Sequence, residues 1–180
     1  DLDCLIFASG FEVGTEYARR SGFETTGRNG ETLSGHWADG MRTLHGTHVH
    51  GFPNLFFLVG PNTGLGTNSI VYMIESQLNY VIGAIEATGR GKRTCDVRPE
   101  VMEAFCDKMQ QKIKGSVWVN GGCASWYIDA NGKVTTLWPD FTFRFRQETN
   151  RFDAESYVLE PVPAGGGVPA RPRAQCLRDP

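Results

Sequence analysis

The stretch Leu55-Phe56-Phe57-Leu58-Val59-Gly60-Pro61-Asn62-Thr63-Gly64-Leu65-Gly66-Thr67-Asn68-Ser69 decides the fold class of this chain. Its first five residues are all apolar, a pattern typical of a strand that is covered on both faces. Gly60-Pro61 ends this strand, and a loop rich in glycine, asparagine and threonine follows. Residues 68–88 then carry apolar side chains every three or four positions, which predicts a long helix. A buried strand followed by such a helix indicates an α/β architecture.

Two helices are predicted after the loop. The helix over residues 68–88 ends at Gly89, a natural C-cap, and a second helix begins at Pro99 and ends at Gly115. The first helix is expected to bury a stripe that consists of Ile70, Ile74, Leu78, Val81, Ile82 and Ile85. The second helix is expected to bury Val101, Met102, Phe105, Met109 and Ile113.

Another apolar run lies at the start of the chain, in residues 2–8. It also predicts a strand covered on both faces, and such a strand needs a neighbour on each side. The rest of the sequence offers few candidates for those neighbours. We therefore expect the chain to be the C-terminal part of a longer protein. The alternative is that this run is an ordinary first strand of a small α+β domain.

The other segments are predicted to be irregular or short. Residues 11–53 are expected to form a surface excursion with one hairpin around Arg28-Asn29-Gly30. Asn131-Gly132 predicts a hairpin, and residues 143–152 alternate aromatic and basic side chains like an edge strand. The glycines and prolines of residues 161–180 predict a disordered tail. The expected divisions are residues 1–115 for the α/β part, 116–160 for a β-rich extension and 161–180 for the tail.

Length and composition exclude several classes of protein. The 180 residues carry 18 Lys plus Arg against 20 Asp plus Glu, so the formal net charge of -2 provides no field to attract nucleic acid. With 40% hydrophobic and 21% charged residues, and no apolar run long enough to cross a bilayer, the chain resembles neither a disordered polyelectrolyte nor a membrane protein. Its five cysteines form no C-x-x-C pair and are odd in number, which favours reduced thiols in the cytoplasm.

The loop between the strand and the first helix has the strongest chemical signal. Glycines let a planar or phosphorylated ligand approach the backbone, and the first-turn N–H groups of the helix present partial positive charge. For a flavin, that charge would stabilise the N1/C2 carbonyl region of the reduced ring. The alternative is a plain connection whose glycines serve turn geometry. A G-x-G-x-x-G fingerprint is not met, because Ser69 stands in its last place.

Other chemical constellations have weaker support. His45, His48 and His50 offer imidazole ligands, but no carboxylate or cysteine accompanies them at a ligand-like spacing, so no metal is expected. The sequence has neither a G-x-S-x-G elbow nor a P-loop. Trp118, Trp126 and Tyr127 either line a substrate pocket or pack the C-terminal segment, and we favour packing.

Several blocks carry a family resemblance when they are taken in order. Asp3-Cys4-Leu5-Ile6-Phe7-Ala8-Ser9-Gly10-Phe11 has the form D-x-x-x-x-A-[TS]-G-[FY], and it precedes Leu33-Ser34-Gly35-His36-Trp37, residues 51–62 and Ile74-Glu75-Ser76-Gln77. Gly122-Cys123-Ala124-Ser125-Trp126-Tyr127 and Leu137-Trp138-Pro139 complete the set. Together the blocks cover about residues 1–146 and resemble the C-terminal region of class B flavin-dependent monooxygenases, most closely the Baeyer-Villiger type.

This resemblance implies a partial three-layer FAD/NAD(P)-binding fold with a C-terminal β-hairpin extension. Residues 1–115 would be the C-terminal part of its FAD-binding domain. Two groups of residues would lie near the flavin, and the N-terminus of the first helix would point toward the ring. They are Ala8, Ser9 and Gly10 at the end of a sheet strand, and Gly60, Pro61, Asn62, Thr67, Asn68 and Ser69 in the loop.

The resemblance also implies an activity. In that family NADPH reduces FAD, oxygen adds at flavin C4a, and the peroxyflavin inserts one oxygen atom into a ketone or a soft heteroatom. The implied partners are therefore a small ketone and O2; the alternatives are an N- or S-oxygenating enzyme of the same superfamily and a truncated, non-catalytic interaction module. The family's dinucleotide fingerprints, signature motif and catalytic arginine have no counterpart here. We therefore expect the catalytic residues upstream, and we expect the 180 residues alone neither to turn over nor to bind FAD tightly.

Overall fold

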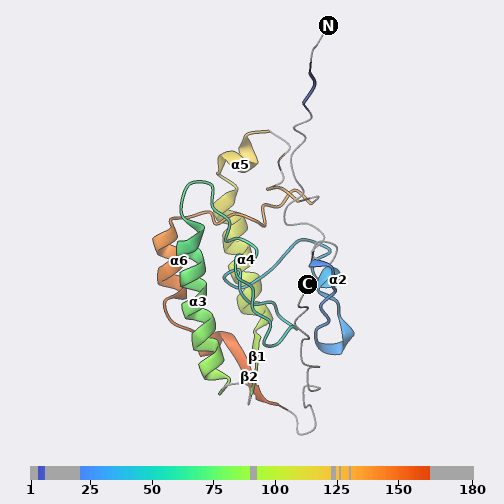
Figure 1. Ribbon diagram of the computed structural model, residues 1–180, viewed down its shortest axis with the longest axis vertical. Helices are drawn as coiled ribbons and strands as arrows, with labels where there is room; N and C mark the ends of the chain where they lie inside the picture. The colour runs from blue at the N-terminus through green and yellow to red at the C-terminus, as the bar shows by residue number, and fades with distance from the viewer. Residues whose placement is uncertain are drawn as a thin grey trace, which may run out of the picture.

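The computed structural model describes residues 4–6, 21–89, 93–122, 125, 127–129 and 131–162 of the chain. Figure 1 labels most of the elements in chain order. They are the 3-10 turn η1 (Arg28–Gly30), α2 (Leu33–His36), α3 (Ile70–Ala87), β1 (Arg93–Val97), α4 (Pro99–Ile113), α5 (Val117–Asn120), α6 (Thr142–Thr149), the 3-10 turn η2 (Ala154–Ser156) and β2 (Tyr157–Pro161). None of the described helices combines the length and the apolar character that crossing a bilayer requires.

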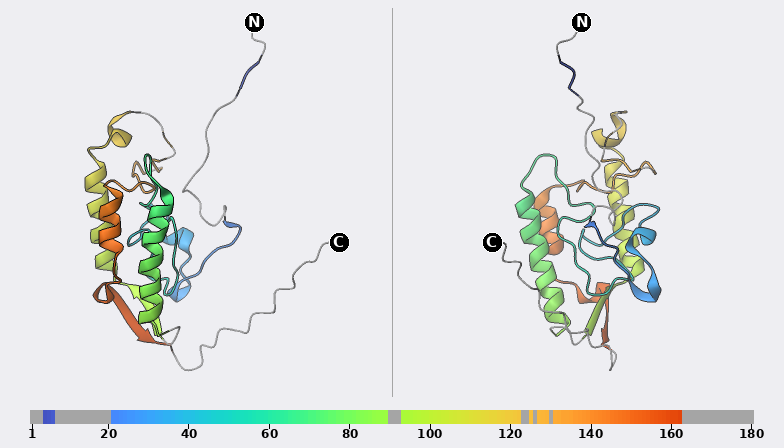
Figure 2. Two further views of the ribbon diagram at one scale, coloured as in Figure 1. Left: turned by 60° about the vertical axis from the view of Figure 1, so that its left-hand side comes forward. Right: turned by 45° about the vertical axis from the view of Figure 1, so that its right-hand side comes forward.

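Three helices and a small sheet enclose the main core. In Figures 1 and 2, α3, α4 and α6 run side by side along the long axis, and the sheet lies at one end of them. The sheet is one antiparallel pair, in which Arg93 faces Pro161 and Val97 faces Tyr157. The core draws buried side chains from every one of these elements, among them Met73, Tyr80, Val97, Met109, Phe145 and Tyr157.

Both predicted helices are present, but α3 buries a different face from the expected one. Its bounds agree with the prediction, whereas its buried residues are Met73, Ser76, Gln77, Tyr80 and Ala84. Leu78, Ile82 and Ile85 of the expected stripe are 40%, 52% and 45% exposed. Apolar spacing missed this face because two of its members are polar side chains that are hydrogen-bonded inside the protein.

The second helix confirms its prediction more fully. Pro99 occupies the first turn of α4, where a missing N–H costs nothing. Met102, Phe105, Met109 and Ile113 are buried, and Val101 packs partly buried against the same core. Spacing sufficed here because every inward position of α4 is apolar.

Several strand predictions are wrong within the described residues. Residues 55–59 pair with no strand there; the Phe57 N–H bonds to the Thr47 carbonyl oxygen at 2.8 Å and Val59 has a φ of 57°. A parallel sheet is therefore missing from the described part of the chain, because a buried strand forms only beside its partners. Residues 4–6 have no regular structure, and the rest of the predicted first strand and the tail from residue 163 lie outside the described residues.

The β-rich extension expected over residues 116–160 contains α5, α6 and η2 as well as β2, and much of the rest of its described part is turn or irregular structure. The predicted edge strand is wrong: most of it forms the helix α6, in which Phe145 packs into the core and Arg146 lies over the Tyr72 ring at 4.0 Å. The turn at Asn131-Gly132 is confirmed, with a single bridge between Ile128 and Val134. Residues 11–53 were expected to form a surface excursion, yet four residues of this range are buried in a second cluster together with Phe57. They are Leu33, Trp37, Val49 and Phe52.

Candidate functional site

The candidate site is the loop over residues 60–69 together with the first turn of α3. The loop has a buried base and an exposed tip: Pro61, Asn62 and Thr63 are buried, whereas residues 66–69 are exposed. Thr63 Oγ1 donates a 2.6 Å hydrogen bond to the Gly60 carbonyl oxygen, which closes the base on itself. A rigid base with an open tip leaves the tip backbone available to a ligand.

A neighbouring segment, residues 134–138, holds the base in place. The Asn62 N–H bonds to the Thr135 carbonyl oxygen at 2.7 Å. Asn62 Nδ2 donates to the carbonyl oxygens of Val134 and Leu137 at 3.2 and 3.1 Å. The side chain of Asn62, predicted to lie against the flavin, is thus used inside the protein.

Asn62→Asp is expected to lower the free energy of unfolding by about 3 kcal/mol, because a buried carboxylate would face two carbonyl oxygens without a donor. Urea denaturation measures this change. Asn79→Asp on the exposed side of α3 is the matched control and should change the stability by less than about 0.5 kcal/mol. Equal effects of the two substitutions would contradict the interior role of Asn62.

The loop glycines are explained in part by close contacts within the protein. A Cβ on Gly60 would lie 2.3 Å from the Gly46 carbonyl oxygen, and one on Gly64 would lie 2.8 Å from the Thr136 carbonyl oxygen. A Cβ on Gly66 would lie 3.2 Å from the Trp118 ring. The first two glycines are needed for close backbone contacts within the protein, so they do not by themselves indicate a ligand.

The first turn of α3 is open to a ligand. Its N-cap, Ser69, makes no side-chain capping bond, and the turn holds no acidic residue. Asn68 Oδ1 accepts from the Ser69 N–H at 2.7 Å, and Asn68 Nδ2 donates to Thr142 Oγ1 at 2.9 Å. Thr67, Asn68 and Ser69 are all exposed. This end of the helix therefore offers partial positive charge at the surface, which suits an anionic or electron-rich ligand.

The predicted site residues divide into two groups. The half-buried Gly60 and the buried Pro61 and Asn62 belong to the base, and Thr67, Asn68 and Ser69 belong to the exposed tip. All six residues were predicted to lie near the flavin, but the structure places only the second three at the exposed tip. Ala8, Ser9 and Gly10 lie outside the described residues.

The three histidines lie in different surroundings and form no ligand set. The His45 ring packs edge-on against Tyr80 and Phe105, and His48 Nδ1 shares a 2.8 Å hydrogen bond with Tyr157 Oη. His50 Nδ1 donates to the Val97 carbonyl oxygen at 2.8 Å. Among the described residues, no group of three His, Cys, Asp or Glu side chains is placed to hold a metal ion.

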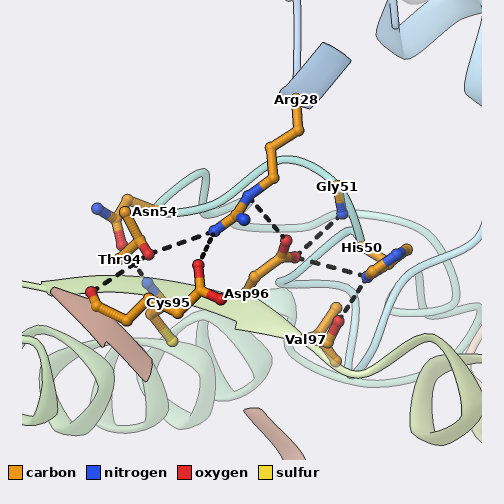
Figure 3. Close-up of polar contacts among 9 residues, drawn as sticks. Arg28, His50, Gly51, Asn54, Thr94, Cys95, Asp96 and Val97 are labelled. Atoms are coloured by element: carbon orange, nitrogen blue, oxygen red, sulfur yellow. Dashed lines mark hydrogen bonds and ion pairs between the residues drawn. The ribbon is translucent and has the colours of Figure 1, made fainter. Parts of the chain in front are cut away.

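A polar cluster that the sequence analysis did not predict holds residues 51–54, which precede the loop, against β1. Figure 3 shows Asp96 of β1 accepting from the Gly51 N–H at 3.0 Å and facing Arg28 Nε at 3.5 Å. Arg28 also pairs with Glu160 at 2.9 Å. The sequence does offer one signal for this cluster, namely the carboxylate of Asp96 in the middle of a strand-forming segment. A buried charge of this kind requires partners.

Two further bonds in Figure 3 complete this anchor. The Asn54 N–H bonds to the Cys95 carbonyl oxygen at 3.0 Å, and Asn54 Oδ1 accepts from the Cys95 N–H at 2.8 Å. Asn54 adopts a φ of 61°, which asparagine tolerates better than most residues. The residues that lead into the site are therefore held to β1 before the loop begins.

Comparisons with known proteins bear on this geometry. A search of protein-family models finds no match. A Baeyer-Villiger monooxygenase from Pseudomonas aeruginosa is 45% identical over 165 residues, which are 91% of this chain and 31% of that protein. A closed crystal structure of cyclohexanone monooxygenase has a TM-score of 0.72 at 25% identity, over 90% of this chain and 31% of that one. OTEMO, solved in complex with FAD and NADP, has a TM-score of 0.70 at 20% identity, over 88% of this chain and 30% of that one. The chain spans about a third of the length of these proteins.

Proposed function

Over 91% of its residues the chain is related to the Baeyer-Villiger monooxygenases, and on this premise we propose that it supplies the flavin side of an FAD- and NADPH-dependent monooxygenase. The observation that carries the proposal is the agreement between this relationship and the open first turn of α3 beside the exposed tip of the loop. The substrate class is a small ketone, into which one oxygen atom of O2 is inserted. FAD supplies the redox chemistry when it is bound.

The residues of the loop and helix would hold an isoalloxazine ring. The exposed tip, Thr67, Asn68 and Ser69, would hold the edge of the ring, and Gly66 beside it lacks the Cβ that would lie 3.2 Å from the Trp118 ring. The N–H groups of the first turn of α3 would stabilise negative charge on the pyrimidine edge of the ring. The absence of an acidic side chain in this first turn keeps the local charge favourable. These residues bind and orient; the proton and hydride chemistry belongs to groups elsewhere in the enzyme.

Several exposed apolar side chains support the proposal that another part of the enzyme packs against these residues. Leu58 and Val59 before the loop are 47% and 44% exposed, and Leu78, Ile82 and Ile85 line the outward side of α3. The three apolar side chains on one exposed face of α3 indicate a surface that another part of the enzyme covers. The match to about a third of each relative agrees with this interpretation. We expect the upstream portion of the same enzyme to cover this surface.

A flavin titration tests the proposed function. The complete polypeptide that carries this sequence is expected to bind FAD tightly, to show visible absorption bands that NADPH bleaches, and to convert a ketone to an ester. The 180 residues alone are expected to bind FAD weakly, because the phosphate-binding fingerprints are missing from them. A complete polypeptide without FAD binding would overturn the proposal in favour of an interaction module. Tight binding and bleaching by the 180 residues alone would show that they hold a whole site.

A further inference from the structure

Gln77 is a buried polar side chain of α3 that lies beneath the base of the loop. It is fully buried, and its carboxamide uses both ends. Gln77 Nε2 donates to the carbonyl oxygens of His45 and Gly46 at 3.0 and 3.1 Å and to Thr47 Oγ1 at 3.2 Å. Gln77 Oε1 accepts from the Val59 N–H at 2.9 Å. One side chain therefore links the helix to two separate segments of the chain.

Val59 is the residue that most needs this support. Its φ of 57° lies in the left-handed region, which is unfavourable for a β-branched side chain. Such a conformation persists only where the surroundings hold it. The bond from the Val59 N–H to Gln77 Oε1 is a direct tether of this strained residue, and Gly60 of the candidate site follows immediately.

The turn on the other side of Gln77 also touches the loop base. A Cβ on Gly46 would lie 2.2 Å from Thr63 Cγ2 and 2.8 Å from the Pro61 carbonyl oxygen. Gly46 and Gly60 are equally close, as the 2.3 Å distance from a Gly60 Cβ shows. Gln77 thus fixes the Gly46 turn, and the Gly46 turn supports the loop base.

We propose that Gln77 is a positioning residue for the flavin loop, holding Val59 and the Gly46 turn so that the base of the loop keeps a fixed relation to α3. The inference rests on the proposed function, because it assigns a role within that same site. Gln77 does not touch the flavin in this proposal. It acts through Val59 and Gly46, and its effect is to align the loop tip with the first turn of the helix.

The test compares two variants of the complete polypeptide. Gln77→Met keeps a side chain of similar length but removes the four contacts of the carboxamide. It is expected to weaken FAD binding by at least about tenfold and to alter the visible circular dichroism of the bound flavin at saturating FAD. The matched control is Ala84→Gly, at another buried position of α3, which lowers helix stability without touching the loop. It is expected to change the melting temperature similarly while leaving FAD affinity and the flavin spectrum unchanged.

A second substitution tests whether Gln77 acts through Val59. Val59→Gly relieves the left-handed strain, so in the Gln77→Met background it is expected to recover part of the FAD affinity. Equal affinity losses in Gln77→Met and Ala84→Gly, or a loss that Val59→Gly does not relieve, would overturn the proposal. If Gln77→Met does not fold, Thr47→Val removes one acceptor of Gln77 and should weaken FAD binding by a smaller factor; no change there would also overturn it. A wild-type polypeptide that binds no FAD would instead contradict the proposed function.

Discussion

Gly60→Ala is expected to lower the free energy of unfolding by about 3 kcal/mol and to abolish tight FAD binding by the complete polypeptide. The added Cβ would lie 2.3 Å from the Gly46 carbonyl oxygen and 3.0 Å from Phe57 Cβ. A backbone atom on one side cannot swing away as the end of a flexible side chain does. The loop base therefore has to move, and the tip that follows it moves as well.

Urea denaturation and an FAD titration together measure this effect. Gly115→Ala is the matched control, because nothing lies within 4 Å of its added Cβ and α4 has already ended. The control is expected to change the stability by less than about 0.5 kcal/mol and to leave FAD affinity unchanged. A Gly60→Ala protein as stable as the control would show that the Gly46 and Gly60 segments are not in close contact.

Acidification is expected to destabilise the fold steeply between about pH 6.5 and pH 4. Burial lowers the pKa of His45 to about 4, and burial together with the nearby His45 lowers the pKa of His48 to about 3. His45 Nδ1 and His48 Nε2 are buried without hydrogen-bond partners among the described residues, so neither ring has a ready acceptor for an added proton. Both rings therefore stay mostly neutral in the folded state until the pH approaches 4.

The sign of the pH dependence follows from proton uptake. In the unfolded chain both imidazoles take up protons as the pH falls through about 6.5, while in the folded protein they do not. The unfolded state binds more protons, so stability falls as the pH falls. Each histidine contributes a slope of up to about 1.4 kcal/mol per pH unit, or about 2.7 kcal/mol for the two.

Urea midpoints measured from pH 7.5 downward test this prediction. His48→Gln removes one titrating ring from the pair and is expected to reduce the slope by up to about half, although it also loses the bond to Tyr157 and is less stable at neutral pH. The slope is the informative quantity, since a general loss of packing shifts all midpoints together. An unchanged slope in His48→Gln would contradict the assignment of the acid sensitivity to this residue.

The bounds of α3 and α4, the turns at Asn29 and Gly132, and the family relationship could all be predicted from the sequence. These features depend on local chemistry, such as Pro99 at a first turn, or on the order of short motifs. The candidate loop was also found this way, because its glycines and its place between an apolar run and a helix are visible without a structure.

Tertiary structure alone decided which face of α3 is buried, where the side chain of Asn62 points and what holds Val59 in a left-handed conformation. Gln77 lies on the buried face of α3, yet a polar residue does not count toward an apolar periodicity. Its carboxamide is buried without a large penalty only because carbonyl oxygens far away in the sequence accept its hydrogen bonds. Residues 55–59 have the composition of a strand, yet a strand forms only with neighbours at hydrogen-bonding distance. The sequence determined the local preferences, and contacts between residues far apart in the chain determined which of them the fold uses.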